Sequence, residues 1–167
     1  MSGYFFFEPL PGPAPDLFSF RFVEPGEHGD WQEALALVNE DVAATLPEEP
    51  PLRLVACPGD ADAPELLYVA RSNGEWHHNT LLAEPPGTLP DAVAAVAEAA
   101  QESLMELLHR VWPVCPDHRL GAHLCLTPDG APAWGCSGAR GERPAPHVLA
   151  PVGALTGPGT SRRGKGA

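Results

Sequence analysis

The sequence predicts an α+β fold, in which an antiparallel sheet is packed by two helices and is followed by a C-terminal hairpin. Two segments carry apolar residues at helical spacing, and several short segments between them alternate apolar and polar residues as strands do. In addition, three of the four cysteines and three of the seven histidines lie between Trp112 and His147. With 167 residues, the chain has room for one hydrophobic core and a modest appended segment.

The first helix is expected over residues 31–45. Asp30 is a suitable N-cap residue, and Glu33 lies three residues later, where it completes a capping box. The second helix is expected to open at Pro90-Asp91 and to stop at Pro113, because proline cannot continue a helix. The apolar faces comprise Trp31, Ala34, Leu35, Leu37, Val38, Val42 and Leu46 in the first helix and Val93, Val96, Ala100, Leu104, Leu107, Leu108 and Val111 in the second.

The segments around and between these helices have the short apolar or alternating patterns of strands. Strands are expected over residues 17–23, 52–56, 66–70 and 76–82. The dipeptide Asn73-Gly74 precedes the last of them and predicts a two-residue hairpin turn with positive φ at both positions. The strands that follow the first helix are therefore expected to form an antiparallel meander.

Beyond the second helix, residues 122–126 and 132–135 are strand-like and flank a turn at Asp129-Gly130. The prolines near the N-terminus indicate an extended arm, and the Gly-, Pro-, Ser- and Arg-rich end indicates a disordered tail. The expected organisation is an arm over residues 1–16, an α+β domain over residues 17–113, a hairpin subdomain over residues 114–153 and a tail over residues 154–167.

Charge is distributed unevenly along the chain. Residues 1–113 carry 19 acidic residues against four arginines, or −15, whereas residues 114–167 carry three acidic against six basic residues, or +3. An acidic body repels phosphate backbones, so a cationic protein or peptide is the better candidate partner and nucleic acid is disfavoured. The alternative explanation is that the acidic excess only confers solubility.

The segment Cys115-Pro116-Asp117-His118 places two metal-ligand residues three positions apart, so a tight turn can direct both at one ion. Cys136, at the far end of the hairpin, is the natural third ligand. The candidates for the fourth ligand are, in order, His147, Cys125 and His123. We therefore expect a zinc ion that organises the C-terminal hairpin through Cys115, His118, Cys136 and His147.

Two tryptophans, Trp112 and Trp134, are expected to shield this ion from solvent. The alternative is that the cysteines are simply buried thiols beside a surface histidine, because free cysteine is among the most buried residue types.

The pattern Trp-Pro-x-Cys-Pro-x-His, followed by Trp-x-Cys and a later histidine, resembles one carried by small uncharacterised proteins of high-GC bacteria. The resemblance covers residues 105–153 and includes Trp112, Pro113, Cys115, Pro116, His118, Trp134, Cys136 and His147. It implies a bacterial protein with a metal site of this kind, and it implies no particular activity.

The sequence contains no Gly-rich phosphate loop, no nucleophile elbow and no His-Glu-x-x-His motif. The function we expect is therefore non-enzymatic: an acidic protein-binding or regulatory module with a structural zinc site.

A small zinc hydrolase is the first alternative, in which Cys115, His118 and Cys136 hold the ion and His123 or His77 assists a bound water. His77 and His78 lie on an expected strand and should point to opposite faces. A second alternative is nucleic-acid binding through the basic C-terminal third, which contains Arg119, Arg140, Arg143, Arg162, Arg163 and Lys165.

No segment has the pattern of a signal peptide or a membrane span. The apolar residues 4–7 form too short a run and lack a basic flank. A cytoplasmic location is expected, in which the four cysteines stay reduced and are available as metal ligands.

Overall fold

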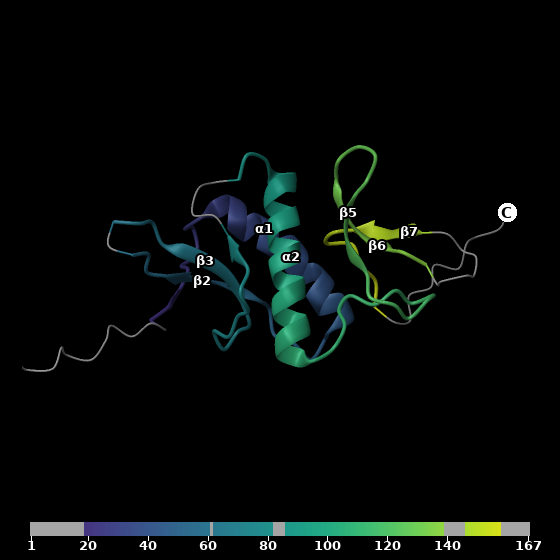
Figure 1. Ribbon diagram of the computed structural model, residues 1–167, viewed down its shortest axis with the longest axis horizontal. Helices are drawn as coiled ribbons and strands as arrows, with labels where there is room; N and C mark the ends of the chain where they lie inside the picture. The colour runs from purple at the N-terminus through teal and green to yellow at the C-terminus, as the bar shows by residue number, and fades with distance from the viewer. Residues whose placement is uncertain (1–18, 61, 82–85, 139–145, 158–167) are drawn as a thin grey trace, which may run out of the picture.

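The computed structural model describes residues 19–60, 62–81, 86–138 and 146–157. Two helices, α1 (Gly29–Thr45) and α2 (Leu89–Leu108), lie between a four-stranded sheet and a three-stranded sheet (Figure 1). Both sheets are antiparallel, and α2 contacts strands of each. The predicted α+β class, with helices packed against an antiparallel sheet, is confirmed.

The four-stranded sheet has the strand order of the sequence, so the predicted meander is confirmed. Its strands are β1 (Arg21–Phe22), β2 (Arg53–Cys57), β3 (Leu66–Ala70) and β4 (Thr80–Leu81). The two outer strands are shorter than predicted. β4 is shorter because residues 76–79 form an irregular connection in place of a strand. Residues 17–18 and 82 of the expected strands lie outside the described residues.

The turn before this connection differs from the predicted two-residue type. The N–H of Gly74 donates to the carbonyl of Arg71 at 2.9 Å, and the N–H of Arg71 donates to the carbonyl of Glu75 at 2.8 Å. Only Gly74 of the dipeptide has positive φ, at 90°, so the prediction of positive φ at Asn73 is wrong. The loop is a three-residue hairpin, in which a turn is followed by one glycine in the left-handed region.

α1 ends at Thr45, as predicted, but the start of α1 and both ends of α2 differ from the predicted residues. α1 begins at Gly29 after His28, which has a left-handed φ of 52°, so Asp30 lies in the first turn and is not the N-cap. In α2 the hydroxyl of Thr88 accepts the N–H of Asp91 at 3.3 Å. That helix ends at Leu108, because His109 adopts a left-handed φ of 50°, several residues before Pro113.

The three-stranded sheet contains the predicted C-terminal hairpin and one strand that was not predicted. Its strands, in spatial order, are β5 (His123–Leu126), β6 (Pro132–Cys136) and β7 (His147–Pro151). β7 follows a segment rich in Gly, Arg and Pro, and no strand was predicted after it. A β-bulge between Trp134 and Gly135 adjusts its register against β6.

Side chains from both sheets and both helices share one hydrophobic core. Trp112, Trp134 and Val152 pack in the same buried cluster as the apolar faces of α1 and α2. Trp112 and Trp134 are in edge-to-face contact, with ring centroids 5.3 Å apart. The C-terminal sheet is therefore built onto the core and does not form a separate lobe.

A buried carboxylate on α1, that of Asp41, fastens the C-terminal segment to the helix. Its oxygens accept three N–H groups, from the Trp134 indole at 2.7 Å and from the backbones of Gly153 at 2.7 Å and Leu155 at 2.8 Å. Residues 154–157, expected in the disordered tail, are thus held against α1. The remainder of the expected tail and the expected arm lie outside the described residues. Among the described residues, neither helix is long and apolar enough to cross a membrane.

Candidate metal centre

The loop after α2 is closed by backbone hydrogen bonds on either side of Cys115. The N–H of Cys115 donates to the carbonyl of Leu120 at 2.8 Å, and its own carbonyl accepts the N–H of Arg119 at 2.8 Å. Arg119 takes a left-handed φ of 55°, which reverses the chain. The turn brings the Cys115 and His118 side chains together, as the spacing of the two residues predicts.

Gln101 of α2 holds both ends of this loop. Its amide nitrogen donates to the carbonyl of Trp112 at 3.0 Å and to the carbonyl of Ala122 at 2.7 Å. The helix therefore sets the position of the loop relative to the core. The sequence offered no signal for this role, because a half-buried glutamine on the polar side of a helix looks like a surface residue.

The other two predicted ligands come from neighbouring strands. Cys136 at the end of β6 is the register partner of His147 at the start of β7. Partners in an antiparallel pair project from the same face of the sheet, so the two side chains lie side by side. The strand that was not predicted, β7, is thus the element that positions His147.

These four side chains meet in one cluster. The Nδ1 atom of His118 lies 3.5 Å from the sulfur of Cys115 and 3.4 Å from the sulfur of Cys136. The Nε2 atom of His147 lies 3.8 Å from the sulfur of Cys115. Among them, Cys115, His118 and His147 have ligand atoms that all lie within 4.8 Å of one another, and this group could hold a metal ion.

Burial and backbone N–H groups act in opposite directions on the pKa of the Cys115 thiol. Burial raises the pKa of Cys115, the backbone N–H groups of His118 and Asp117 lower it, and neighbouring Cys136 raises it again. The sulfur of Cys136 also accepts a backbone N–H, from Gly138 at 3.4 Å. The Cys115 sulfur therefore faces N–H donors that favour its thiolate, and a bound cation would complete the deprotonation that burial opposes.

Each imidazole directs one nitrogen into the cluster and one away from it. The outward atoms, Nε2 of His118 and Nδ1 of His147, are buried and have no hydrogen-bond partner within the described ranges. The inward Nε2 of His147 also lies 4.0 Å from the carboxylate of Asp117, whose side chain is 75% exposed. The inward atoms, Nδ1 of His118 and Nε2 of His147, are the ones that face the cysteine sulfurs and could bind a metal ion.

The other candidates for the fourth position lie elsewhere. His123 and Cys125 are on β5, where they project from the face of the sheet opposite to Trp134 and Cys136, and the Cys125 sulfur lies over Gly135. Strand alternation therefore keeps both away from the cluster. Of the three alternatives, the structure brings His147 to the other predicted ligands.

His77 and His78 belong to the connection between β3 and β4, at the sheet on the other side of the helices. Their rings are in edge-to-face contact with centroids 4.6 Å apart, so the expectation that they point to opposite faces is wrong. The reason is that this connection is not a strand. Of the basic residues in the C-terminal third, only Arg119 falls within the described ranges.

Comparisons of the chain with models of protein families, with curated proteins and with solved structures gave no match.

Proposed function

We propose that the protein is a non-enzymatic binding module whose C-terminal sheet is stabilised by a zinc ion bound to Cys115, His118, Cys136 and His147. The observation that carries this proposal is the spacing of the ligand atoms. Zinc lies about 2.3 Å from thiolate sulfur and about 2.0–2.1 Å from imidazole nitrogen, so a tetrahedral site separates sulfur from nitrogen by roughly 3.6 Å. Three of the four sulfur–nitrogen distances in the cluster are 3.4, 3.5 and 3.8 Å. Cys136 contributes one of these three distances, although it lies outside the group whose ligand atoms are all within 4.8 Å of one another.

The residue types also favour zinc over harder cations. Two thiolates and two imidazoles form a common structural zinc set, whereas calcium and magnesium require oxygen ligands. The zinc would supply a link between the loop after α2 and the ends of β6 and β7. Four protein ligands leave no open position for a reactive water, which favours a structural role over the hydrolase.

The binding role rests on charge. A net charge of −15 over residues 1–113 attracts cationic proteins or peptides and disfavours nucleic acid. We place the protein in the cytoplasm, a reducing compartment, because its four cysteines are free thiols and none is paired in a disulfide.

Elemental analysis of protein purified without a metal-affinity tag tests the zinc site. We expect about one zinc per chain, and we expect Cys136→Ser and His147→Ala to lose it. The matched controls are Cys125→Ser and His123→Ala, which change the same residue types on the neighbouring strand and should retain the ion. A folded, metal-free wild-type protein would refute the proposal, as would equal loss of zinc from the control variants.

A further inference from the structure

The outer face of the four-stranded sheet carries a second feature, which the metal centre does not use. Tyr68 projects away from the helices, and Trp76 and Phe20 pack beside it, with the Trp76 ring centroid 5.2 Å from Tyr68 and 5.4 Å from Phe20. These rings wall a hollow of about 480 Å³, here called the aromatic hollow. It is lined by Phe20, Tyr68, Gly74, Glu75, Trp76, His77, His78 and Leu107.

The rings are presented to solvent and are not buried in a core. Phe20 is 37% exposed, and Tyr68 and Trp76 are half-buried. The face of an aromatic ring is negative and attracts cations. The same aromatic cluster already holds one guanidinium, because Arg53 lies 3.6 Å from the ring centroid of Phe22, which contacts Phe20.

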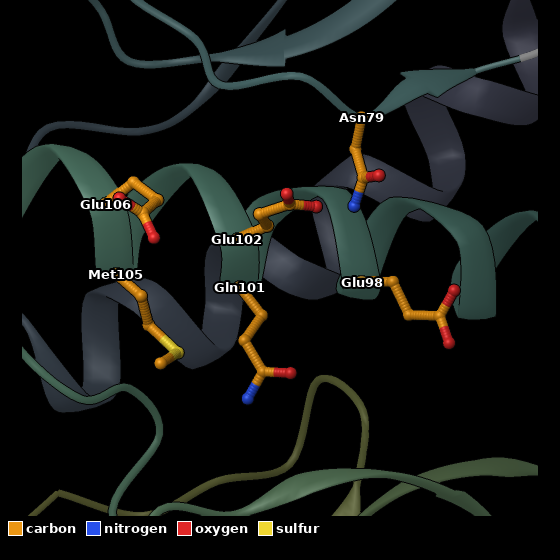
Figure 2. Close-up of a pocket in the computed structure, with 6 residues that line it drawn as sticks. All are labelled: Asn79, Glu98, Gln101, Glu102, Met105 and Glu106. Atoms are coloured by element: carbon orange, nitrogen blue, oxygen red, sulfur yellow. The ribbon is translucent and has the colours of Figure 1, made fainter.

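An acidic hollow adjoins the aromatic one. It has a volume of about 340 Å³ and is lined by Asn79, Glu98, Gln101, Glu102, Met105 and Glu106 (Figure 2). Glu102 lies 3.9 Å from the imidazole of His77, which lines the aromatic hollow, so the two hollows are neighbours. None of the described residues that line either hollow is a lysine or an arginine.

The acidic hollow is elongated along the helix. Glu98, Glu102 and Glu106 recur every fourth residue and so lie on one side of α2. At 1.5 Å per residue they span roughly 12 Å of the helix. That length matches roughly three to four residues of an extended peptide, and it exceeds what one small cation occupies.

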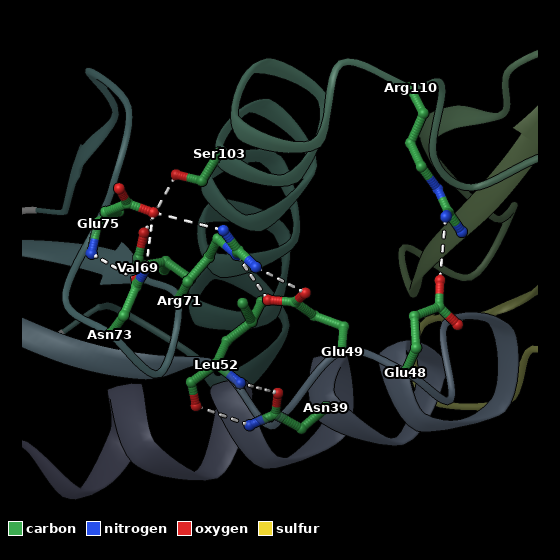
Figure 3. Close-up of polar contacts among 10 residues, drawn as sticks. All are labelled: Asn39, Glu48, Glu49, Leu52, Val69, Arg71, Asn73, Glu75, Ser103 and Arg110. Atoms are coloured by element: carbon green, nitrogen blue, oxygen red, sulfur yellow. Dashed lines mark hydrogen bonds and ion pairs between the residues drawn. The ribbon is translucent and has the colours of Figure 1, made fainter.

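The wall of the aromatic hollow is held in place by polar contacts from inside the fold. The N–H of His77 donates to the hydroxyl of buried Ser103 at 3.1 Å, and that hydroxyl donates to the carbonyl of Val69 at 3.1 Å. Arg71 forms a two-pronged ion pair with Glu49, at 2.7 and 3.0 Å (Figure 3). The Glu75 carboxylate accepts hydrogen bonds from Arg71 and Asn73, so it stabilises the turn, and we give it no part in binding a ligand.

We propose that the aromatic hollow binds an arginine side chain of a basic peptide, and that neighbouring basic residues of the peptide lie along Glu98, Glu102 and Glu106. Arginine is favoured over lysine because its planar guanidinium stacks on aromatic faces, as Arg53 does on Phe22. This inference rests on the binding role proposed above and supplies that role with a site and a ligand chemistry.

The test uses the full-length, zinc-containing protein and a fluorescein-labelled hexapeptide of alternating arginine and glycine. Fluorescence anisotropy should show binding, and a peptide with neutral citrulline in place of arginine should bind at least about tenfold more weakly. Trp76→Leu should weaken binding by about 3- to 30-fold, with Trp76→Phe between it and the wild type. Glu102→Gln should weaken binding by about 2- to 5-fold. Glu33→Gln, which removes the same charge from α1, should have no effect.

Several results would overturn the proposal. These are equal binding of the citrulline peptide, wild-type affinity of a folded Trp76→Leu variant, or displacement by tetramethylammonium at the concentration at which the peptide binds. The last result would assign the hollow to a small cation. If Trp76→Leu does not fold, Trp76→Phe carries the comparison. Zinc content is measured on the same samples. A protein that contains zinc but does not bind the peptide refutes only the peptide-binding inference. A protein that binds the peptide but contains no zinc refutes only the proposed zinc site.

Discussion

Removal of the Asp41 carboxylate is expected to destabilise the whole protein, because this group joins α1 to the C-terminal sheet. Asp41→Ala leaves three N–H donors without an acceptor: the buried one of Trp134 and the half-buried ones of Gly153 and Leu155. Each orphaned donor costs about 1–3 kcal/mol, or roughly 3–9 kcal/mol together. Removal of a buried charge offsets several kcal/mol of this loss, so we expect the free energy of unfolding to fall by about 2–4 kcal/mol.

A graded series separates the hydrogen bonds from the volume of the side chain. Asp41→Asn keeps the volume and one oxygen, which can still accept from Trp134 and Gly153, but its NH₂ group then faces the N–H of Leu155. We expect it to lose about 1–2 kcal/mol, less than the alanine variant. Glu40→Ala removes the neighbouring exposed carboxylate and should change stability by less than about 0.5 kcal/mol.

Urea unfolding followed by tryptophan fluorescence measures these differences, and Trp134 reports locally on the lost bond. In a thermal scan, the alanine variant should melt roughly 5–15 °C lower than the wild type. An Asp41→Ala variant as stable as Glu40→Ala would show that the three hydrogen bonds contribute nothing net. Equal losses in the alanine and asparagine variants would assign the effect to the charge alone.

The pH dependence of this contribution follows from the direction of its pKa shift. Burial raises the pKa of Asp41, while the N–H donors of Gly153, Trp134 and Leu155 oppose the shift. An acid with a raised folded pKa contributes stability that is fully present below its unfolded pKa, about 3.9, and that is lost as pH rises through the folded pKa. The stability of Asp41→Asn relative to the wild type should therefore improve as pH rises from the unfolded pKa of Asp41 to its folded pKa. A stability difference that does not change with pH would contradict the raised pKa of Asp41.

Three further predictions concern other parts of the fold. A zinc chelator should lower the melting temperature of the wild type but not that of Cys136→Ser, because metal binding and folding are coupled; equal responses would place the metal elsewhere. Gly74→Ala should cost more stability than Gly130→Ala in urea unfolding. Both glycines have positive φ, at 90° and 84°, but only at Gly74 would a Cβ overlap the Phe20 ring. The left-handed backbone costs an alanine about 1–2 kcal/mol at either position, and at Gly74 the Phe20 ring must also move, so equal losses would refute the close contact. Gln101→Glu should destabilise the protein by about 2–4 kcal/mol and weaken zinc retention, because a carboxylate would face the carbonyls of Trp112 and Ala122. Glu98→Gln, an exposed change on the same helix, is its control and should leave both unchanged.

Local features of the chain determined the helices, the C-terminal hairpin and two residues of the candidate metal centre, Cys115 and His118. Helical periodicity, a proline or a left-handed residue at each end, and the Asp129-Gly130 turn act over a few residues. The Cys-Pro-x-His segment is equally local, because a tight turn brings Cys115 and His118 together whatever surrounds it. For this reason the sequence alone could predict the α+β class and the approach of these two candidate ligands.

The rest of the metal centre depends on the pairing of strands. Cys136 meets His147 only because β6 and β7 are in register, and β7 itself was not predicted from its composition. Strand alternation then decides between the candidates, because Cys125 and His123 project from the opposite face. No spacing rule along the chain contains that information.

Long-range contacts alone determined the roles of Asp41, Gln101 and the rings around Trp76. Asp41 lies in a segment that reads as an ordinary amphipathic helix, yet its partners are 93 to 114 residues away along the chain. The aromatic hollow likewise joins residues from β3, its following connection and the end of α2. Such groups are close only after the sheets have packed on the helices, so the tertiary structure, and not the local sequence pattern, decides which of them meet.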